Sequence, residues 1–135
     1  MKNIFLETNS YSRYFRGDKS IKKVISKSDV IFISVITLGE LYLGFKEGSR
    51  EGENMGALKE FVNDAKVRIV NVDRKVSWSY GRIKYELRRN GTPIPDNDLW
   101  IAAQVIESSS ELVTYDKHFL SIKGLKVWKK LSGKY

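Results

Sequence analysis

The sequence predicts an α/β domain in which a central, mainly parallel sheet of about five short strands is flanked by helices. Short apolar runs recur at residues 4–6, 30–33, 67–72, 112–113 and 125–128. The first, second and fourth runs do not alternate apolar with polar residues, which is typical of strands buried on both faces of a parallel sheet. Longer segments with helical spacing lie between the runs. This alternation favours an α/β sandwich built from right-handed crossovers.

Three segments have the spacing of packed helices. Residues 76, 80, 83 and 87 are apolar or aromatic at steps of four, three and four, and a second such stripe runs from Val35 to Phe45. This pattern predicts helices with one buried face. Residues 99–106 are apolar nearly all round, which predicts a fully buried helix.

Glycine and proline mark the expected breaks between elements. The segment 8–29 is long enough for two short helices, with Gly17 and Asp18 at the break. Three glycines within residues 48–56 predict a loop, followed by a helix at about 57–65. The segment Gly91-Thr-Pro-Ile-Pro predicts a helix stop followed by a turn.

Length and composition predict a single domain over residues 1–135 and exclude several kinds of site. The chain has no cysteine, which excludes a disulfide scaffold and a thiolate metal site. His118 is the only histidine in the sequence, which excludes a multi-histidine zinc site. The formal net charge is +8, from 24 Lys and Arg against 16 Asp and Glu. This excess favours a polyanionic partner, nucleic acid before an anionic membrane surface.

The N-terminal segment does not look like a targeting signal. Residues 1–9 lack a long apolar stretch, and Glu7 interrupts the short one. No apolar run approaches the ~20 residues that a membrane span needs. We therefore expect a cytoplasmic protein with no membrane partner.

Polar side chains follow two of the predicted strands directly. Glu7, Thr8 and Asn9 follow the first strand, and residues 114–116 (Thr-Tyr-Asp) follow the fourth. Because ligands of open parallel sheets bind beyond the carboxyl ends of the strands, both segments are candidates for a site. The alternative is helix capping, which fits Asn9 or Ser10 well and Asp116 fairly well, but fits Glu7 less well.

Two further acidic segments could join these strand ends. Glu40 lies opposite the main apolar stripe of its helix but between Ile36 and Leu43, so it is either half-buried or a solvated outer residue. Asp96 and Asp98 precede the buried helix, where they could also cap it or complement its dipole. Four or five converging carboxylates in a basic chain are explained mainly by a divalent cation. Oxygen ligands select Mg²⁺ or Mn²⁺, which can activate water for displacement at phosphorus.

Several basic and aromatic residues are candidates for other roles. Arg13, Arg16, Lys46 and the lysines after Asp116 are candidate RNA contacts. The aromatic residues beside the two arginines are better explained by packing of the first helix than by stacking on RNA. His118 could be a base, but its basic surroundings favour a surface position.

Four motifs together resemble the signature of the PIN-domain family. They are Leu6-Glu7-Thr8-Asn9, Thr37-Leu38-Gly39-Glu40-Leu41, residues 94–103 (IPDNDLWIAA) and Leu112-Val113-Thr114-Tyr115-Asp116. The set is most similar to VapC-type toxins of type II toxin–antitoxin systems, and the resemblance covers essentially the whole chain. It implies a three-layer α/β/α sandwich.

The resemblance also implies an activity, a cofactor, partners and site residues. The activity is that of a Mg²⁺- or Mn²⁺-dependent endoribonuclease that forms homodimers and is inhibited by a cognate VapB-type antitoxin, in a heterotetramer or a larger complex. The implied acidic set is Glu7, Glu40, Asp98 and Asp116, with Glu7, Asp98 and Asp116 as metal ligands. Thr8, Asn9 and Thr114 are implied as polar supports, and Asp96 as a further ligand or supporting group.

The sequence departs from the family pattern at position 7, where Glu stands in place of the family Asp. Glu keeps the charge but extends the carboxylate by one methylene. Two functions from different classes follow: an active ribonuclease, or a weakened PIN module that binds RNA or antitoxin without efficient cleavage. A phosphatase of the haloacid-dehalogenase type is disfavoured, because its two aspartate positions hold Glu7 and Asn9 here.

Overall fold

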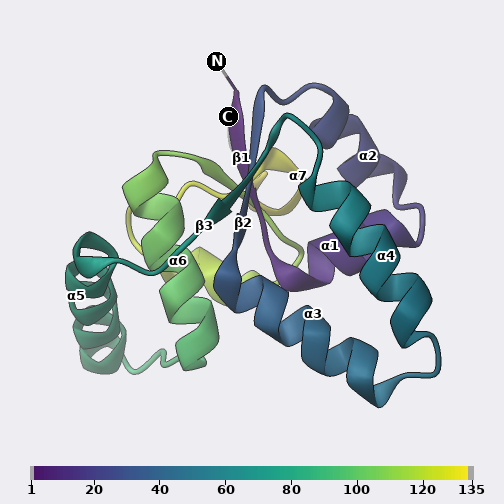
Figure 1. The fold of residues 1–135 in the computed structure, drawn as a ribbon. Helices are drawn as coiled ribbons and strands as arrows, with labels where there is room; N and C mark the ends of the chain where they lie inside the picture. Colours follow the sequence, from purple (N-terminus) through teal and green to yellow (C-terminus); the bar gives the residue numbers. More distant parts are fainter. Residues whose placement is uncertain (1, 134–135) are drawn as a thin grey trace.

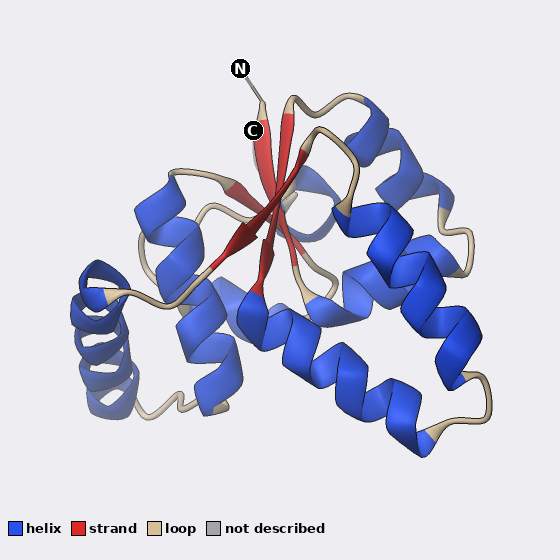
Figure 2. Ribbon diagram, in the orientation of Figure 1, coloured by secondary structure: helices blue, strands red, loops and turns tan. Residues whose placement is uncertain are grey.

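A computed structural model describes residues 2–133 of the chain and contains a parallel sheet. Within these residues the sheet has four strands, β1 (Asn3–Leu6), β2 (Val30–Ser34), β3 (Val67–Val70) and β4 (Glu111–Val113). Their spatial order is β3-β2-β1-β4, and every neighbouring pair is parallel. Helices pack on both sides of the sheet, as Figures 1 and 2 show. The predicted α/β architecture with a parallel sheet is confirmed.

Strands β1 and β4 are the most deeply buried, although β4 lies at the end of the strand order. The side chains of Ile4, Phe5 and Leu6 in β1 have no exposed surface, and the three residues of β4 are also buried. The continuous apolar runs therefore have the predicted cause, because each face of these strands lies against helices. The sequence predicts about five strands, whereas the described residues form four. The run at 125–128 adds only an isolated bridge between Leu112 and Val127.

The crossovers between β1, β2 and β3 contain two helices each. The first holds α1 (Thr8–Phe15) and α2 (Lys19–Ser26), as predicted, and the chain turns between them at Gly17, where φ is +98°. The second holds α3 (Val35–Glu47) and α4 (Glu51–Val62). These four helices lie together on one side of the sheet in Figure 1.

The prediction of a glycine-rich loop before a helix at 57–65 is wrong. Helix α4 begins at Glu51 and ends at Val62, so Gly52 and Gly56 lie inside it. Each glycine weakens a helix interior by about 1 kcal/mol. Two features compensate: Glu51 and Glu53 complement the helix dipole in the first turn, and Leu58 is buried at 2% exposure.

Two of the three aromatic residues of α1, Tyr11 and Tyr14, pack against α4, whereas Phe15 is 50% exposed. Tyr11 is 3% exposed, and its ring centroid lies 5.2 Å from that of Phe61. Tyr14 packs on the same ring at 5.5 Å. Packing, rather than contact with RNA, is therefore the role of these two rings, as the sequence favoured.

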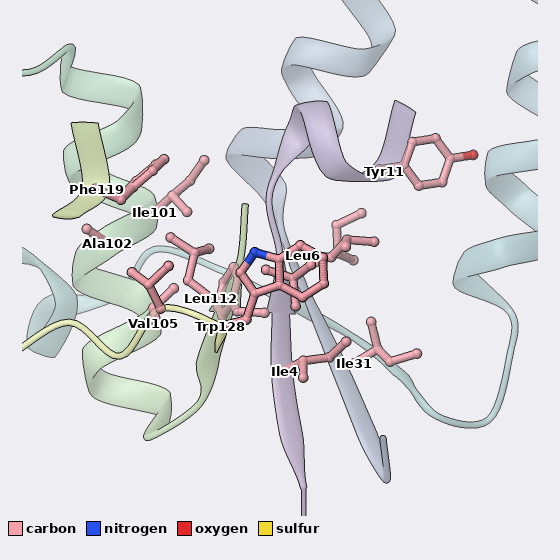
Figure 3. Close-up of a cluster of buried hydrophobic side chains, with 14 of the residues drawn as sticks. Ile4, Leu6, Tyr11, Ile31, Ile101, Ala102, Val105, Leu112, Phe119 and Trp128 are labelled. Carbon is pink, nitrogen blue, oxygen red and sulfur yellow. The ribbon is translucent and has the colours of Figure 1, made fainter. Parts of the chain in front are cut away.

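The long crossover from β3 to β4 covers the other side of the sheet. It contains α5 (Arg74–Asn90) and α6 (Asp96–Ser108), which pack against each other. Gly91 ends α5 in the left-handed conformation with φ of +70°, and the predicted turn follows. Helix α6 is buried along most of its length, and its side chains meet Leu112 and Phe119 in the core (Figure 3).

Short helical segments complete the chain after β4. A 3₁₀ helix, η1 (Lys117–Ser121), buries Phe119, and α7 (Lys129–Ser132) follows the buried Trp128. No helix between residues 2 and 133 combines the length and apolar character needed to cross a membrane.

Candidate active site

The carboxyl ends of β1 and β4 lie side by side. Leu6 pairs with Val113 in parallel register, and the backbone N–H of Glu7 donates to the carbonyl of Val113 at 3.5 Å. The polar segments beginning at Glu7 and Thr114 therefore leave the sheet at the same edge. This arrangement is the position at which open α/β sheets bind ligands.

Asp98 is the electrostatic centre of the acidic residues. It lies in the first turn of α6, and its pKa is raised to about 6 by partial burial and by the negative charges of Asp116 and Glu40. The Asp98 charge in turn adds to the burial that raises the pKa of Glu7. The four predicted acids are therefore coupled through one residue, although they come from four different elements.

Asp98, Asp116 and His118 are close enough to share an ion. One potential ligand atom from each of the three lies within 4.8 Å of the other two. The backbone N–H of Asp116 donates to Thr114 Oγ1 at 3.0 Å, which supports the predicted role of Thr114 in fixing this segment. Asp116 also caps η1 by accepting the backbone N–H of His118 at 2.9 Å. The capping alternative and the ligand role are thus compatible for Asp116.

His118 is the member of this group for which the sequence favours a surface position over a role in the site. Its side chain is 66% exposed, as expected, but Nδ1 lies 3.3 Å from Asp116 Oδ1. The 3₁₀ turn after Asp116 causes this approach, because it folds residue 118 back beside residue 116. A D-x-H spacing at a strand end is the only sequence signal for it.

Glu40 is half-buried and held by a hydroxyl. Thr8 Oγ1 donates to Glu40 Oε1 at 2.6 Å and lies 3.2 Å from Thr37 Oγ1. Thr37 is fully buried in α3, one turn before Glu40. The half-buried alternative for Glu40 is therefore correct, and its carboxylate is in contact with Thr8.

Glu7 takes a position that the sequence did not favour. It is the N-cap of α1, and its Oε1 accepts the backbone N–H of Ser10 at 3.0 Å and the Ser10 hydroxyl at 3.2 Å. The residue is 4% exposed, and burial raises its pKa. Asn9 and Ser10 lie inside the helix, so the expectation that one of them caps it is wrong. Glu7 also lies outside the group formed by Asp98, Asp116 and His118.

Two other predicted residues point away from the carboxylates. The carboxylate of Asp96 accepts hydrogen bonds from Lys84 at 2.8 Å and from the Tyr80 hydroxyl at 2.9 Å, and both bonds lower its pKa. Asp96 thus ties α6 to α5. Lys46 lies in the last turn of α3, at the opposite end of the helix from β2, and pairs with Glu51 at 2.8 Å.

Arg13 and Arg16 lie beside the acidic group. Together with Asn9, Tyr115 and Asp116 they line a hollow of about 380 Å³. Asp116 therefore faces both this hollow and the potential ligand atoms of Asp98 and His118. Among the predicted RNA contacts, the structure brings Arg13 and Arg16 to this hollow and leaves Lys46 away from it.

The donor set fits a hard divalent cation. The raised pKa of Asp98 means that its negative charge is not compensated by the residues around it. Two carboxylates offer the oxygen ligands that Mg²⁺ and Mn²⁺ prefer. Asp98 and Asp116 are the residues best placed to hold such an ion, with Glu40 and Thr114 supporting them.

Comparisons with known proteins agree with the fold and with the sequence motifs. The family model of the PIN domain matches residues 4–125. Ribonuclease VapC2 of Rickettsia felis is 32% identical over 104 residues, which cover 76% of each protein.

Solved structures show the same fold. The crystal structure of VapBC2 from Rickettsia felis, bound to a promoter DNA fragment, contains a chain that matches with a TM-score of 0.82 and 27% identity, over 93% of this chain and 97% of that one. The DNA-bound VapBC of Salmonella typhimurium matches with a TM-score of 0.84 and 24% identity, over 95% and 98% of the two chains. The chain therefore belongs to the PIN-domain family, in the VapC group of the VapBC toxin–antitoxin systems.

Proposed function

We propose that the chain is a Mg²⁺- or Mn²⁺-dependent endoribonuclease, the toxin of a toxin–antitoxin pair. The observation that carries this proposal is the convergence of Glu40, Asp98 and Asp116 at the carboxyl edge of the sheet, in a chain of net charge +8. Such a local concentration of negative charge on a basic protein opposes RNA binding unless a cation compensates it. The ribonuclease name of the Rickettsia relative supports RNA as the substrate.

The roles of the residues follow from their contacts. Asp98 and Asp116 would hold the ion, which when bound activates water and stabilises in-line displacement at phosphorus. Thr8 orients the Glu40 carboxylate, and Thr114 fixes the backbone of Asp116. Glu7 acts on this group through its charge and through the start of α1, which it caps.

The direct test is metal-dependent cleavage of RNA. The purified chain is incubated with a cellular RNA pool in Mn²⁺, in Mg²⁺ and in EDTA, with Asp98→Asn as the matched control. Cleavage that requires the metal and is lost in the control supports the proposal. Metal-independent cleavage, or equal cleavage by the control, contradicts it.

The second candidate function is a weakened module that binds RNA or antitoxin without efficient cleavage. It is favoured by the side chain of Glu7, which is engaged with Ser10 instead of the group at Asp98. Undiminished RNA binding together with absent cleavage in Mn²⁺ would select this function. Restoration of cleavage by Glu7→Asp would identify position 7 as the cause.

The proposed partners are a second copy of the chain and a VapB-type antitoxin. The solved relatives from Rickettsia and Salmonella are VapBC assemblies, which supports an antitoxin for this chain. The candidate antitoxin would be a small DNA-binding protein whose gene neighbours the gene of this chain. Co-expression and co-purification of the two proteins, followed by light scattering, would test the pairing and give the oligomeric state.

A further inference from the structure

The hollow beside Asp116 differs in charge from the acidic group, because two arginines line it. It is lined by Asn9, Arg13, Arg16, Tyr115 and Asp116, and its volume is about 380 Å³. This volume is at the lower end of the roughly 300–1,000 Å³ typical of small-molecule sites. The hollow is therefore large enough for one small ligand, and it lies beside Asp116, a proposed metal ligand.

Two neighbouring side chains, Tyr115 and Asp18, hold Arg13 at this hollow. Its guanidinium lies 4.2 Å from the centroid of the Tyr115 ring and pairs with Asp18 at 3.5 Å. The Tyr115 hydroxyl donates to the same Asp18 carboxylate, at 3.1 Å to one oxygen and 3.3 Å to the other. Each of these three side chains contacts the other two, so Arg13 is held over the Tyr115 ring.

Tyr115 is in turn held by Trp128. Trp128 packs edge-on against Tyr115 with centroids 5.3 Å apart, and its indole N–H donates to the carbonyl of Thr114 at 2.5 Å. Trp128 is 4% exposed, whereas the Arg13 side chain remains 48% exposed. The planar guanidinium is therefore fixed over Tyr115, and the exposed part of the Arg13 side chain borders the hollow. Nucleic-acid bases stack on such planes.

Arg16 contrasts with Arg13 in the same hollow. It ends α1 as the C-cap, its side chain is exposed, and it makes no ion pair or side-chain hydrogen bond within residues 2–133. The two arginines therefore suit the two parts of a nucleotide. Arg16, which is unpaired within these residues, suits the phosphate, and Arg13 on Tyr115 suits the base. Arginine binds phosphate through two parallel hydrogen bonds, and the neighbouring plane accepts the base.

We propose that this hollow is a one-nucleotide subsite for RNA, next to the phosphate that is cleaved. Arg16 binds the phosphate of the adjoining nucleotide, and Arg13 on Tyr115 stacks with its base. The proposal rests on the proposed function, because Asp116 connects the hollow to the acidic group. It makes Arg13 and Arg16 positioning residues that fix the register of the RNA on the carboxylates.

The phosphate contact is tested by binding, so that cleavage is not needed. A fluorescent single-stranded RNA oligonucleotide is titrated with Asp98→Asn and with Asp98→Asn carrying Arg16→Gln, at several salt concentrations. Arg50→Gln is the matched control, because Arg50 is an exposed arginine at the start of α4 and does not line the hollow. Arg16→Gln is expected to weaken binding about tenfold. It should also lower the salt slope by about 0.7, while the control changes little.

The base contact is tested with Arg13→Lys, which keeps the charge and removes the planar surface. The probes are an oligouridine and an abasic chain of the same length. The wild-type chain is expected to prefer the oligouridine, and Arg13→Lys is expected to reduce this preference at least fivefold. Thermal melting checks that the Asp18–Tyr115 contacts still support the fold.

The outcomes separate the subsite from the ribonuclease function. If Arg16→Gln binds RNA with the same affinity and salt slope as Arg50→Gln, the subsite is overturned, even where metal-dependent cleavage is observed. If the chain cleaves no RNA but Arg16→Gln and Arg13→Lys still weaken binding as stated, the subsite stands and the proposed cleavage fails.

Discussion

The carboxylate of Glu7 accepts two hydrogen bonds from Ser10, one from its backbone N–H at 3.0 Å and one from its hydroxyl at 3.2 Å. The residue that follows the first strand is therefore used to begin α1. Ser10 is fully buried, so the carboxylate is drawn inward to reach it. A residue expected to face a metal ion has its oxygen engaged by the helix.

Glu7→Asp is expected to raise the rate of RNA cleavage by roughly ten- to a hundredfold. Misplacement of a reacting group by about 1 Å costs up to about a hundredfold in rate. Aspartate is a good N-cap, so the shorter carboxylate can keep the bond to the N–H of Ser10 while its free oxygen changes position. Single-turnover cleavage by both forms at equal Mn²⁺ is the measurement, and expression without antitoxin should become more toxic.

Glu7→Gln shows whether Glu7 is needed only to cap α1 or also contributes its negative charge to cleavage. The amide oxygen can still accept the N–H of Ser10, so the melting temperature should fall little, whereas Glu7→Ala should cost about 1 kcal/mol of stability. If Glu7→Asp is no faster than the wild type and Glu7→Gln is inactive, Glu7 is already a competent part of the site. If neither change affects cleavage, position 7 lies outside the chemistry.

Mn²⁺ or Mg²⁺ is expected to raise the melting temperature of the chain. The ion would bind the folded state by relieving repulsion among Asp98, Asp116 and Glu40. Binding to the native state alone contributes about 2.7 kcal/mol at a hundredfold excess over the dissociation constant. Thermal melts with millimolar Mn²⁺ and with EDTA measure the shift, and Asp98→Asn is expected to remove most of it. An unchanged melting temperature in Mn²⁺ would argue against a metal site.

Thr8→Val is expected to slow cleavage about tenfold, because it removes the hydroxyl that orients Glu40 at 2.6 Å. Loss of a group that orients an acidic residue at a metal site typically costs ten- to a hundredfold in activity or metal affinity. Thr8→Ser keeps the hydroxyl and should retain most of the activity. Cleavage is best measured in the Glu7→Asp background, with melting temperatures as the check on folding. Equal rates for the valine and serine variants would mean that this hydrogen bond is not used.

The fold could be predicted from the sequence where burial controls the pattern. The strands at residues 4–6 and 112–113 are covered on both faces, so their sequences are continuously apolar. The full length of α4 could not be predicted, because its glycines oppose helix formation locally. The helix also depends on contacts with α3 and β3, which a local sequence pattern does not show. The run at 125–128 is apolar because Val127 and Trp128 are buried, although only one bridge attaches the run to the sheet.

The acidic residues of the site could also be predicted, but not the orientation of each side chain. Strand ends and the start of α6 place Asp98 and Asp116 by topology alone. The direction of Glu7 depends on the N–H groups that α1 leaves unpaired, and His118 approaches Asp116 only because a 3₁₀ turn follows it. The spacing of Asp96 predicts that it joins Asp98, yet Lys84 and Tyr80 hold it toward α5.

The pH dependence of stability gives a test of Asp98 that needs neither RNA nor metal. Its pKa is about 6 in the folded chain, because burial and the charges of Asp116 and Glu40 oppose ionisation, against 3.8 without these effects. A carboxyl group with a raised pKa binds its proton more tightly in the folded state. It therefore costs little well below pH 3.8, destabilises the fold increasingly as the pH rises, and reaches its full effect above about pH 6. After allowance for solvent screening, the full cost is about 1–2 kcal/mol.

Asp98→Asn isolates this contribution, because the amide is neutral at every pH. In EDTA, the two proteins should melt at similar temperatures near pH 4, and the variant should become the more stable one as the pH rises through about 6. A difference of 1 kcal/mol corresponds to roughly 3–5 °C for a domain of this size. Saturating Mn²⁺ at pH 7 should reverse the order, because the wild type gains the ion and the variant does not. A difference in melting temperature that stays constant from pH 4 to pH 7 would show that burial and the acidic neighbours do not raise the pKa of Asp98.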